Sequence, residues 1–437
     1  MRRCCLTLAI LLLFAAEALA GQVTLNVASE LLFRANLKGP YQTLIKTFEQ
    51  QNPGIKVNAY GYPLAEYHQK VLTEMAAGNA PDICESVAMT FYSHAKVGKG
   101  FMPLDSYLDQ WTYLGGEGFD KAMMADFMVD GKISALPVGG ASWGYAYWKP
   151  AFKEAGIRAE DLQTWDDLIA AAKKLTIDRD KDGRIDQYGL GLTNGRDTFD
   201  ILHWEQLAWS IDGGFFPSDQ GPYTAERVSV NSPASVHALE LLADAVHKHK
   251  VVVPGVWTSE KAATDLLLTK KAAIVFVHLG MIEGFKMLKP EEFPNIGWLR
   301  KMSVTWQGKT WKPGVNIGWQ AFGIRSEIPQ EKLPAALQFM RFFGSREGQA
   351  ILAEGGQMPI RKDVVTTLDP AKYRHVADFF EFHNKYYKHI PRQSNLKKRE
   401  IYSRFGDTAF QKILVEGQPP KAVLDKAQEE IADIMKK

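Results

Sequence analysis

Apolar and polar residues along the first hundred positions follow two alternating periods. Strand-like apolar runs occupy residues 23–27 and 55–60, and Pro81 and Asp82 lead into a third run. Between them, apolar residues recur at helical spacing in two segments, each ending near a glycine: Tyr41, Leu44, Ile45 and Phe48, then Leu64, Tyr67, Val71, Leu72 and Met75. Alternating strands and helices predict an α/β fold with a parallel, doubly wound sheet and ligands at the carboxyl ends of its strands.

A second unit begins near Lys132. Residues 133–138 and 145–148 are predicted strands on either side of a glycine-rich turn. Thr164 is predicted to cap a helix, with Asp167 completing a capping box. Further helices around residues 239–246 and 333–343 flank strand-like runs at 272–277 and 315–324. No clean break separates the units, so the sheets are expected to exchange segments.

The first twenty residues form a cleavable export signal. Arg2 and Arg3 precede an apolar run too short to span a bilayer, and Ala18-Leu19-Ala20 is an A-x-A cleavage site. The mature chain is therefore expected to begin near Gly21 and to be periplasmic, without an anchor. Its length exceeds that of a usual single core, so two lobes are expected.

Charge and cysteine content exclude several classes of function. Lys and Arg number 52 against 50 Asp and Glu, and no basic block occurs, so nucleic acid and anionic membranes are poor partners. Only Cys84 survives removal of the signal, so no internal disulfide is expected. The chain holds 11 Trp, more aromatic surface than a core needs, which leaves rings free to line a cleft.

The strongest local motif is an acidic loop with the spacing of a calcium-binding loop. Gly183 occupies its turn position, whereas Gly189 replaces the bidentate Glu of an EF-hand, so a sensor EF-hand is not expected. Two readings stay open: a structural Ca²⁺ site, or a solvated acidic turn balanced by its basic neighbours. The candidate metal-ligating residues are Asp178, Asp180, Asp182, Arg184 and Asp186.

The segment Gly140-Ala141-Ser142-Trp143-Gly144 matches the G-x-S-x-G nucleophile elbow. That chemistry needs a strand, a sharp turn and then a helix, whereas residues 145–148 predict another strand. The same loop suits a crossover between lobes. An exported hydrolase, either an esterase or a glycosidase with a carboxylate pair that the sequence does not single out, remains the enzyme alternative.

Several short segments then accumulate in one order along nearly the whole mature chain. They are Gly78-Asn79-Ala80-Pro81-Asp82-Ile83, Phe101-Met102-Pro103-Leu104-Asp105, Tyr147-Trp148-Lys149, Thr164-Trp165-Asp166, Ala321-Phe322-Gly323-Ile324, Ser345-Arg346-Glu347-Gly348-Gln349 and Gly356-Gln357-Met358-Pro359-Ile360-Arg361. Together they resemble the family 1 extracellular solute-binding proteins, the carbohydrate receptors of ABC importers that include maltose-binding protein.

The resemblance implies a two-lobed periplasmic-binding-protein fold in which hinge closure captures the ligand. Residues 21–131 and 303–345 would form the N-terminal lobe, and residues 132–302 and 346–437 the C-terminal lobe. The implied function is that of a non-catalytic, monomeric receptor that delivers an oligosaccharide, sugar or polyol to an ABC permease in the inner membrane. No cofactor is required beyond the Ca²⁺ considered above. A receptor repurposed for sensing or for an exported redox system stays open.

The resemblance also implies ligand contacts, carried over position by position onto loops at the cleft. Sparse charge in these loops argues against a phosphate ligand. The family's usual stacking Trp is replaced by His278-Leu279-Gly280, so Trp319 is expected to supply the stacking ring. The implied contacts are Ser29, Glu30, Ser86, Thr90, Ser142, Trp143, His203, Trp204, His278, Gly280, Trp319, Arg361 and Tyr402.

Overall fold

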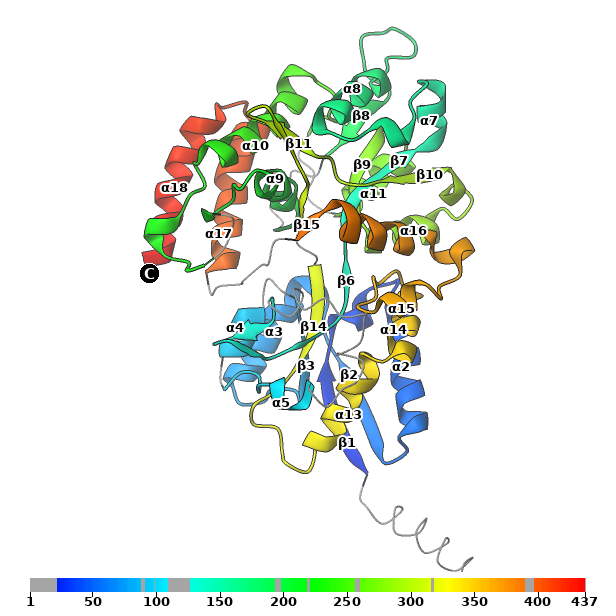
Figure 1. Ribbon diagram of the computed structural model, residues 1–437, viewed down its shortest axis with the longest axis vertical. Coiled ribbons are helices and arrows are strands. Elements are labelled where there is room, and N and C mark those ends of the chain that lie inside the picture. The colour runs from blue at the N-terminus through cyan, green and yellow to red at the C-terminus, as the bar shows by residue number, and fades with distance from the viewer. Residues whose placement is uncertain are drawn as a thin grey trace, which may run out of the picture.

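In the computed structural model, two α/β lobes lie end to end and are joined by extended strands (Figure 1). We name them the lower and the upper lobe after their places in Figure 1. The structure describes residues 22–87, 91–97, 99–108, 126–192, 198–217, 221–255, 260–315, 318–389 and 397–436. The predicted signal peptide and Thr90 lie outside these residues.

The lower lobe is built on a sheet with the strand order β2-β1-β3-β14-β6 in the described residues. β1 is parallel to both β2 and β3, whereas β14 is antiparallel to β3 and β6. β14 is therefore the reversed strand among neighbours that share one direction. The bounds are β1 (Val23–Ala28), β2 (Ile55–Tyr60), β3 (Ile83–Val87), β6 (Leu136–Ala141) and β14 (Gly318–Ile324).

Helices cover both faces of this sheet. Tyr41 and Phe48 of α2 (Lys38–Gln51) pack with Phe339 and Phe343 of α13 (Leu333–Phe343) in one core. The opposite face is covered by α3 (Leu64–Ala76) and α4 (Phe91–Lys96). The lobe is completed by η1 (Glu30–Phe33), α5 (Asp105–Leu108), β4 (Met128–Val129), β5 (Lys132–Ile133), α14 (Arg346–Ala353) and α15 (Lys362–Val365).

The upper lobe is built on a smaller sheet with the order β10-β7-β9-β8 in the described residues. β8 and β9 are parallel, whereas β7 is antiparallel to both of its neighbours, β9 and β10. One strand is again reversed, so each lobe has a mainly parallel sheet, as the resemblance implied. The bounds are β7 (Trp143–Trp148), β8 (Tyr188–Gly191), β9 (Ala272–His278) and β10 (Ile296–Leu299).

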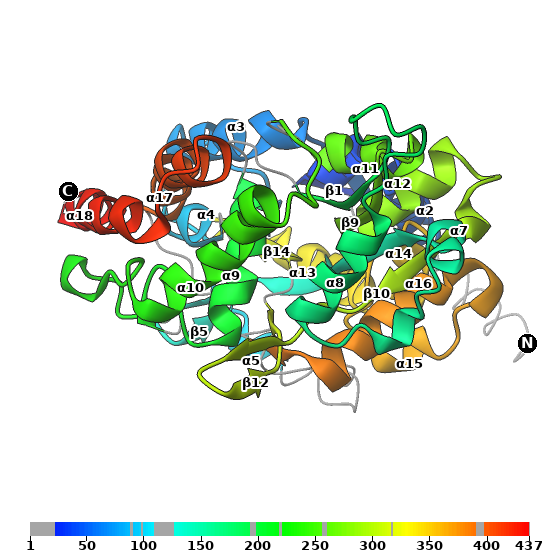
Figure 2. The same ribbon diagram turned by 90° about the horizontal axis from the view of Figure 1, so that it is seen from above.

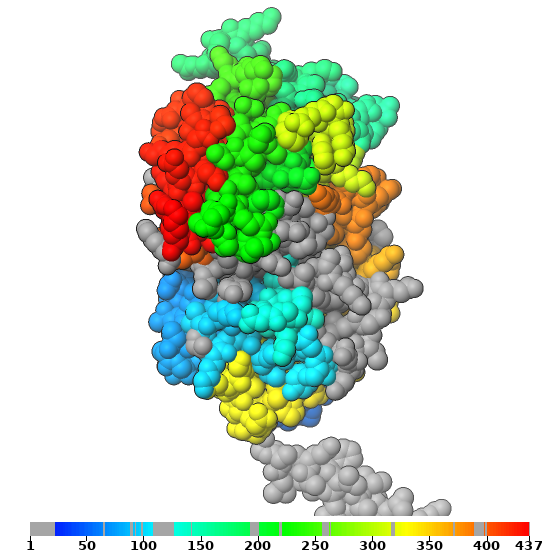
Figure 3. Space-filling model, turned by 60° about the vertical axis from the view of Figure 1, so that its left-hand side comes forward, coloured from blue at the N-terminus to red at the C-terminus, as the bar shows by residue number. Residues whose placement is uncertain are grey.

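The helices of the upper lobe pack around this sheet and extend to the C-terminal pair α17 and α18 (Figure 2). Their bounds are α7 (Lys149–Glu154), α8 (Trp165–Leu175), α9 (Thr198–Ser210), α10 (Pro233–Ala243), α11 (Glu260–Leu268), α12 (Leu279–Leu288), α16 (Pro370–Glu381), α17 (Lys398–Phe405) and α18 (Pro420–Lys436). In Figure 3, α18 and α10 share one side of this lobe.

Short elements complete the upper lobe and its connections. The π-helical segments are η5 (Asp244–Lys248), η7 (Phe382–Tyr386) and η8 (Gly406–Val415), and the 3₁₀ turns are η2 (Ala159–Asp161), η4 (Ala225–Arg227) and η6 (Phe293–Asn295). The short strands are β11 (Val304–Trp306), β12 (Lys309–Trp311), β13 (Gly314–Val315) and β15 (Lys388–His389). Across the described ranges, no helix has both the length and the apolar character needed to cross a bilayer.

The predicted glycine-rich turn near residue 140 is wrong. Gly139 and Gly140 belong to strand β6, and Ser142 is the single residue between β6 and β7. Hydrogen bonding of β6 to β14 extends this stretch into one crossover between the lobes. A Cβ atom at Gly139 would lie 3.0 Å from Gln357 Oε1, so close approach of another side chain, and not a turn, accounts for this glycine.

The structure also divides the lobes differently from the predicted boundaries at residues 132, 303 and 346. β6 pairs in the lower sheet, and Leu352 of α14 packs in the lower core with α2. Residues 303–311 belong instead with the upper lobe, because Ser303 forms a bridge with Thr164 at the start of α8. These assignments depend on contacts between segments far apart in the sequence.

Candidate functional site

The carboxyl ends of strands from both sheets meet where the crossover passes between the lobes (Figure 1). In the lower sheet, Val87 at the end of β3 pairs with Gln320, and Gly140 pairs with Trp319. In the upper sheet, His278 at the end of β9 pairs with Trp143. We call the residues at these two edges the lower rim (Ser29, Glu30, Glu85, Ser86 and Gln320) and the upper rim (Ser142, Trp143, His203, His278 and Lys301).

Two buried carboxyl groups form the centre of the lower rim. Glu85 Oε2 accepts hydrogen bonds from Ser29 Oγ at 2.5 Å and from the Glu30 backbone N–H at 2.8 Å. Glu30 Oε1 accepts from Arg34 Nη2 at 2.5 Å and from Gln320 Nε2 at 3.2 Å. Burial, together with the nearby charge of Glu30, raises the pKa of Glu85 above its usual range. Within the described residues, Glu30 Oε2 and Glu85 Oε1 have no hydrogen-bond partner.

The same strand end, that of β3, places Ser86 against a buried histidine. Ser86 Oγ lies 2.9 Å from His94 Nδ1, and His94 is fully buried. Burial, with a smaller effect from His68, lowers the pKa of His94 to about 3, so this imidazole is neutral at physiological pH. The hydroxyl and imidazole add uncharged polar groups to the lower rim.

Aromatic rings stack behind the upper rim. Trp143 and His203 both stack on Phe276, with ring centroids 4.9 Å and 4.2 Å from it. His203 Nε2 lies 3.1 Å from the Tyr145 hydroxyl. His278 caps α12 by accepting the Gly280 N–H at Nδ1, 3.0 Å away. The cap explains why Gly280 has no side chain, since a Cβ there would lie 2.8 Å from His278 Cε1.

Lys301 is a member of the upper rim that the sequence analysis did not identify. It follows β10, and its backbone N–H donates to the Tyr387 hydroxyl at 2.8 Å, while that hydroxyl donates to the Trp143 carbonyl at 3.2 Å. Only 3% of Lys301 is exposed. Burial lowers the pKa of its ammonium group far below the usual range. The sequence carries no signal for this placement, because a lysine next to Arg300 after an apolar strand has the pattern of a solvated strand end.

The structure places two of the other predicted contacts, Trp204 and Tyr402, in the upper core, and it pairs a third, Arg361, with a neighbouring carboxylate. The Trp204 indole N–H donates to the Ser235 carbonyl at 3.0 Å, and its ring packs on Phe405 inside the upper lobe. Tyr402 is buried and donates to Glu205. Arg361 forms hydrogen bonds of 2.8 Å and 2.9 Å with Asp363. Trp204 and Tyr402 therefore pack in the upper core, and we do not include them in the proposed site.

The two remaining predicted contacts lie on the crossover. Trp319 belongs to β14, opposite Gly140. Ser142 is buried, and its hydroxyl has no partner among the described residues. Because β7 follows Ser142 directly, the strand–turn–helix geometry of a nucleophile elbow is absent from this described segment.

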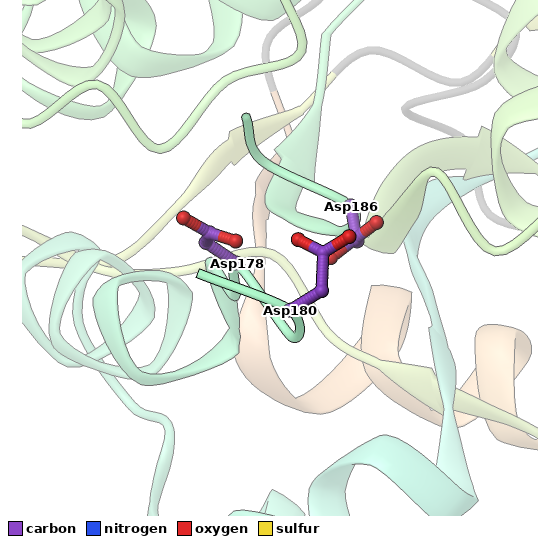
Figure 4. Close-up of side chains that lie close together, drawn as sticks. All are labelled: Asp178, Asp180 and Asp186. Atoms are coloured by element: carbon purple, nitrogen blue, oxygen red, sulfur yellow. The ribbon is translucent and has the colours of Figure 1, made fainter. Parts of the chain in front are cut away.

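The acidic loop connects α8 to the amino end of β8, so it lies at the opposite edge of the upper sheet from the upper rim. One carboxylate oxygen from each of Asp178, Asp180 and Asp186 lies within 4.8 Å of the others (Figure 4). The other two predicted metal ligands, Asp182 and Arg184, form a hydrogen bond in which Asp182 Oδ1 accepts the Arg184 N–H at 2.7 Å. The loop thus gathers three oxygen ligands of the kind that Ca²⁺ prefers.

Comparisons with known proteins all match this chain to binding proteins. A family model described as bacterial extracellular solute-binding protein matches residues 43–378. A binding protein from Brucella abortus (strain 2308) is 31% identical over 202 residues, which are 46% of this chain and 45% of that protein. The chain thus spans about half the length of the curated relatives that it matches at this level. The arabinooligosaccharide-binding protein of Bacillus subtilis (strain 168) is 23% identical over 349 residues, 78% of this chain and 75% of that protein.

Solved structures share the fold over nearly the whole chain. A solute-binding protein of an ABC transporter from Thermotoga lettingae, bound with α-D-tagatose, superimposes with a TM-score of 0.75 at 20% identity, covering 94% of this chain and 100% of that one. Maltose-bound MalE3 of T. maritima gives a TM-score of 0.76 at 20% identity, with 94% and 100% covered. These likenesses establish the two-lobed fold.

Proposed function

Because the chain belongs to the bacterial extracellular solute-binding proteins, we propose that it is a periplasmic receptor that captures a carbohydrate between its lobes. The receptor delivers this ligand to an ABC permease in the inner membrane, and it acts as a monomer without catalysis. The signal at residues 1–20 accounts for its export. Three of the proteins compared above are named for, or were solved with, arabinooligosaccharides, tagatose and maltose, which supports a carbohydrate.

The observation that carries this proposal is the pair of rims at the carboxyl ends of both sheets. A sugar presents hydroxyl groups around its ring and apolar C–H groups on its faces. The lower rim offers carboxylate, amide and hydroxyl groups at Glu30, Gln320 and Ser29, which suit hydroxyl groups. Trp319 belongs to β14 beside the crossover, and we expect it to supply the ring that stacks on a sugar face.

The crossover also supplies the hinge that capture requires. One residue, Ser142, separates β6 in the lower sheet from β7 in the upper sheet. Rotation of a few backbone dihedral angles here changes the angle between the lobes without disturbing either core. Closure would then bring the two rims onto one ligand.

We also propose that the acidic loop binds a structural Ca²⁺. Support comes from the carboxylate oxygens of Asp178, Asp180 and Asp186 within 4.8 Å of one another, which repel unless a cation neutralises them. The position of the loop, away from both rims, suits stabilisation of the upper lobe and not ligand capture.

A thermal-shift screen of the mature protein with neutral and acidic sugars and polyols, in the presence of Ca²⁺, tests the proposed function. A ligand at a hundred times its dissociation constant adds about 2.7 kcal/mol of stability, which raises the melting temperature. Calorimetry with the best ligand then compares Glu30→Gln with Glu327→Gln, a matched change at an exposed residue paired with Lys99. We expect Glu30→Gln to weaken binding about tenfold or more, since hydrogen bonds to charged groups contribute about 1.5–3 kcal/mol. A flat screen would contradict the carbohydrate receptor, and hydrolysis of a panel sugar or ester that disappears in Ser142→Ala would indicate an enzyme instead.

A further inference from the structure

We propose that the ligand is an acidic sugar and that the upper rim binds its carboxylate through Lys301. This inference rests on the proposed function and specifies the class of carbohydrate. It assigns a charged group to the upper rim and the hydroxyl groups of the same ligand to the lower rim.

The first observation is a group of buried polar atoms that lack partners. Within the described residues, Lys301 Nζ, His203 Nδ1 and Ser142 Oγ have no hydrogen-bond partner. These residues are 3%, 3% and 1% exposed, respectively. Folded proteins pair nearly all buried polar atoms, and each exception requires an explanation. A ligand that accepts hydrogen bonds at the upper rim supplies that explanation.

The second observation is that these residues are neighbours and carry no counter-charge. Lys301 connects through Tyr387 to the Trp143 carbonyl, adjacent to Ser142, and the charge of Lys301 acts on His203. In the described chain, the Tyr387 ring lies beside the amine and the charge of Lys301 acts on the His203 imidazole, and neither of these groups is an anion. No carboxylate of the described residues offsets the burial of Lys301. The centroid of the Tyr387 ring lies 5.3 Å from Lys301 Nζ.

An anion satisfies these groups better than a neutral hydroxyl does. A buried ammonium requires an opposite charge, because the loss of water is otherwise uncompensated. The amino end of α12, a helix of 10 residues, begins at the same edge directly after β9, so its dipole adds positive potential there. A ligand carboxylate accepting from Lys301 would meet both conditions.

The charge of the rims favours a carboxylate over a phosphate and orients the ligand. Lys301 is one cation, and Arg34 of the lower lobe is already paired with Glu30 at 2.5 Å. A single amine, protonated when the acid binds, matches the one charge of a carboxylate and leaves one charge of a phosphate dianion without a partner. The negative charge of Glu30 repels an anion from the lower rim, so we expect the acid group to point to the upper lobe.

Calorimetry on the mature protein tests this inference. The panel pairs D-glucuronate, D-galacturonate and D-gluconate with D-glucose, D-galactose and sorbitol, and adds D-glucose 6-phosphate. We expect an acid to bind at least about thirtyfold more tightly than its neutral counterpart, the factor that corresponds to loss of one partner of a buried charged pair. Lys301→Met should remove this preference. Lys388→Met, a matched change at an exposed lysine paired with Asp212, should retain it.

The outcomes separate this inference from the function on which it rests. Equal binding of neutral and acidic sugars, or a preference that survives in Lys301→Met, would overturn the inference and leave a carbohydrate receptor. Preference for the phosphate over every carboxylate would overturn the carboxylate assignment. Absence of binding across the whole panel would overturn both. Lys301→Gln, which keeps a polar side chain, provides a second variant, and near-ultraviolet circular dichroism verifies that each variant is folded.

Discussion

Replacing Lys301 by methionine should stabilise the ligand-free protein. Lys301 is buried, and its ammonium has no hydrogen-bond partner in the described chain. Methionine has a similar length and loses no hydration when buried. Replacement of buried charged groups by apolar side chains of similar volume is neutral or stabilising by about 1–4 kcal/mol. We expect a gain within this range at pH 7.

The pH dependence of that gain distinguishes charge from packing. A lysine in the unfolded chain has a pKa of about 10.4, whereas burial lowers the pKa of Lys301 in the folded protein. Between these two values the unfolded state binds the additional proton, so the free energy of unfolding of the wild type rises with pH. The slope is about 1.4 kcal/mol per pH unit. The advantage of the methionine variant should therefore be largest near neutral pH and should shrink toward pH 10.

Neighbouring groups do not obscure this window. Burial lowers the pKa of His203 to about 3, so it stays neutral throughout. Burial also raises the pKa values of Tyr145 and Tyr387, and neither phenol ionises below pH 10. Lys301 is therefore the group whose replacement changes the difference in bound protons between the folded and unfolded states in this window.

Urea unfolding followed by tryptophan fluorescence at pH 7, 8.5 and 10 provides the measurement. The matched control is Lys388→Met, which breaks an exposed ion pair with Asp212 and should change stability by at most about 1 kcal/mol. A methionine variant at position 301 that is less stable than the wild type at pH 7 would refute the reasoning. So would an advantage that does not change with pH, since packing alone produces no proton linkage.

Three further predictions concern other parts of the molecule. Chelation by EDTA should lower the melting temperature if Asp178 and its neighbours hold Ca²⁺, and an unchanged melt would support the solvated turn. Asp82→Asn should destabilise the lower lobe by about 3 kcal/mol in urea, because the buried Asp82 carboxylate accepts from Lys332 at 2.8 Å and lies 3.3 Å from Arg325; a loss below 1 kcal/mol would contradict this role. Trp319→Ala should abolish carbohydrate affinity in calorimetry while the fold is retained, and unchanged affinity would remove Trp319 from the site.

Helices and strands that depend on interactions between residues close in the sequence were predicted with nearly correct bounds. The capping box of α8 is present, with Thr164 Oγ1 accepting the Asp167 N–H at 3.2 Å and Asp167 Oδ2 accepting the Thr164 N–H at 2.8 Å. The strand at residues 55–60 and the helix at residues 333–343 are also confirmed. The turn at residue 140 was wrong because β6 becomes a strand only by pairing with β14, a contact between distant segments. Local pattern contains no information about that partner.

The same limit explains the mixed outcome for the predicted site. His203 and Trp204 are adjacent on α9, and successive residues of an α-helix point about 100° apart. His203 consequently stacks on Phe276 behind the upper rim, whereas Trp204 packs on Phe405 in the core. The family resemblance indicated that the segment containing His203 and Trp204 lies near the ligand. Which of the two residues faces the upper rim depends on how α9 packs on its neighbours.

The burial of Lys301 can be found only from a structure, and it is explained only by a function. Its neighbours Tyr387 and His203 come from distant segments of the chain, so no short window of sequence indicates burial. Natural sequences readily reach stabilising substitutions at positions without a role, and methionine would satisfy the packing here. An unpaired buried lysine at the edge where both sheets end is therefore better explained by a negatively charged ligand than by stability. The loss of stability in the ligand-free protein and the preference for an acidic sugar would then both arise from the same buried amine.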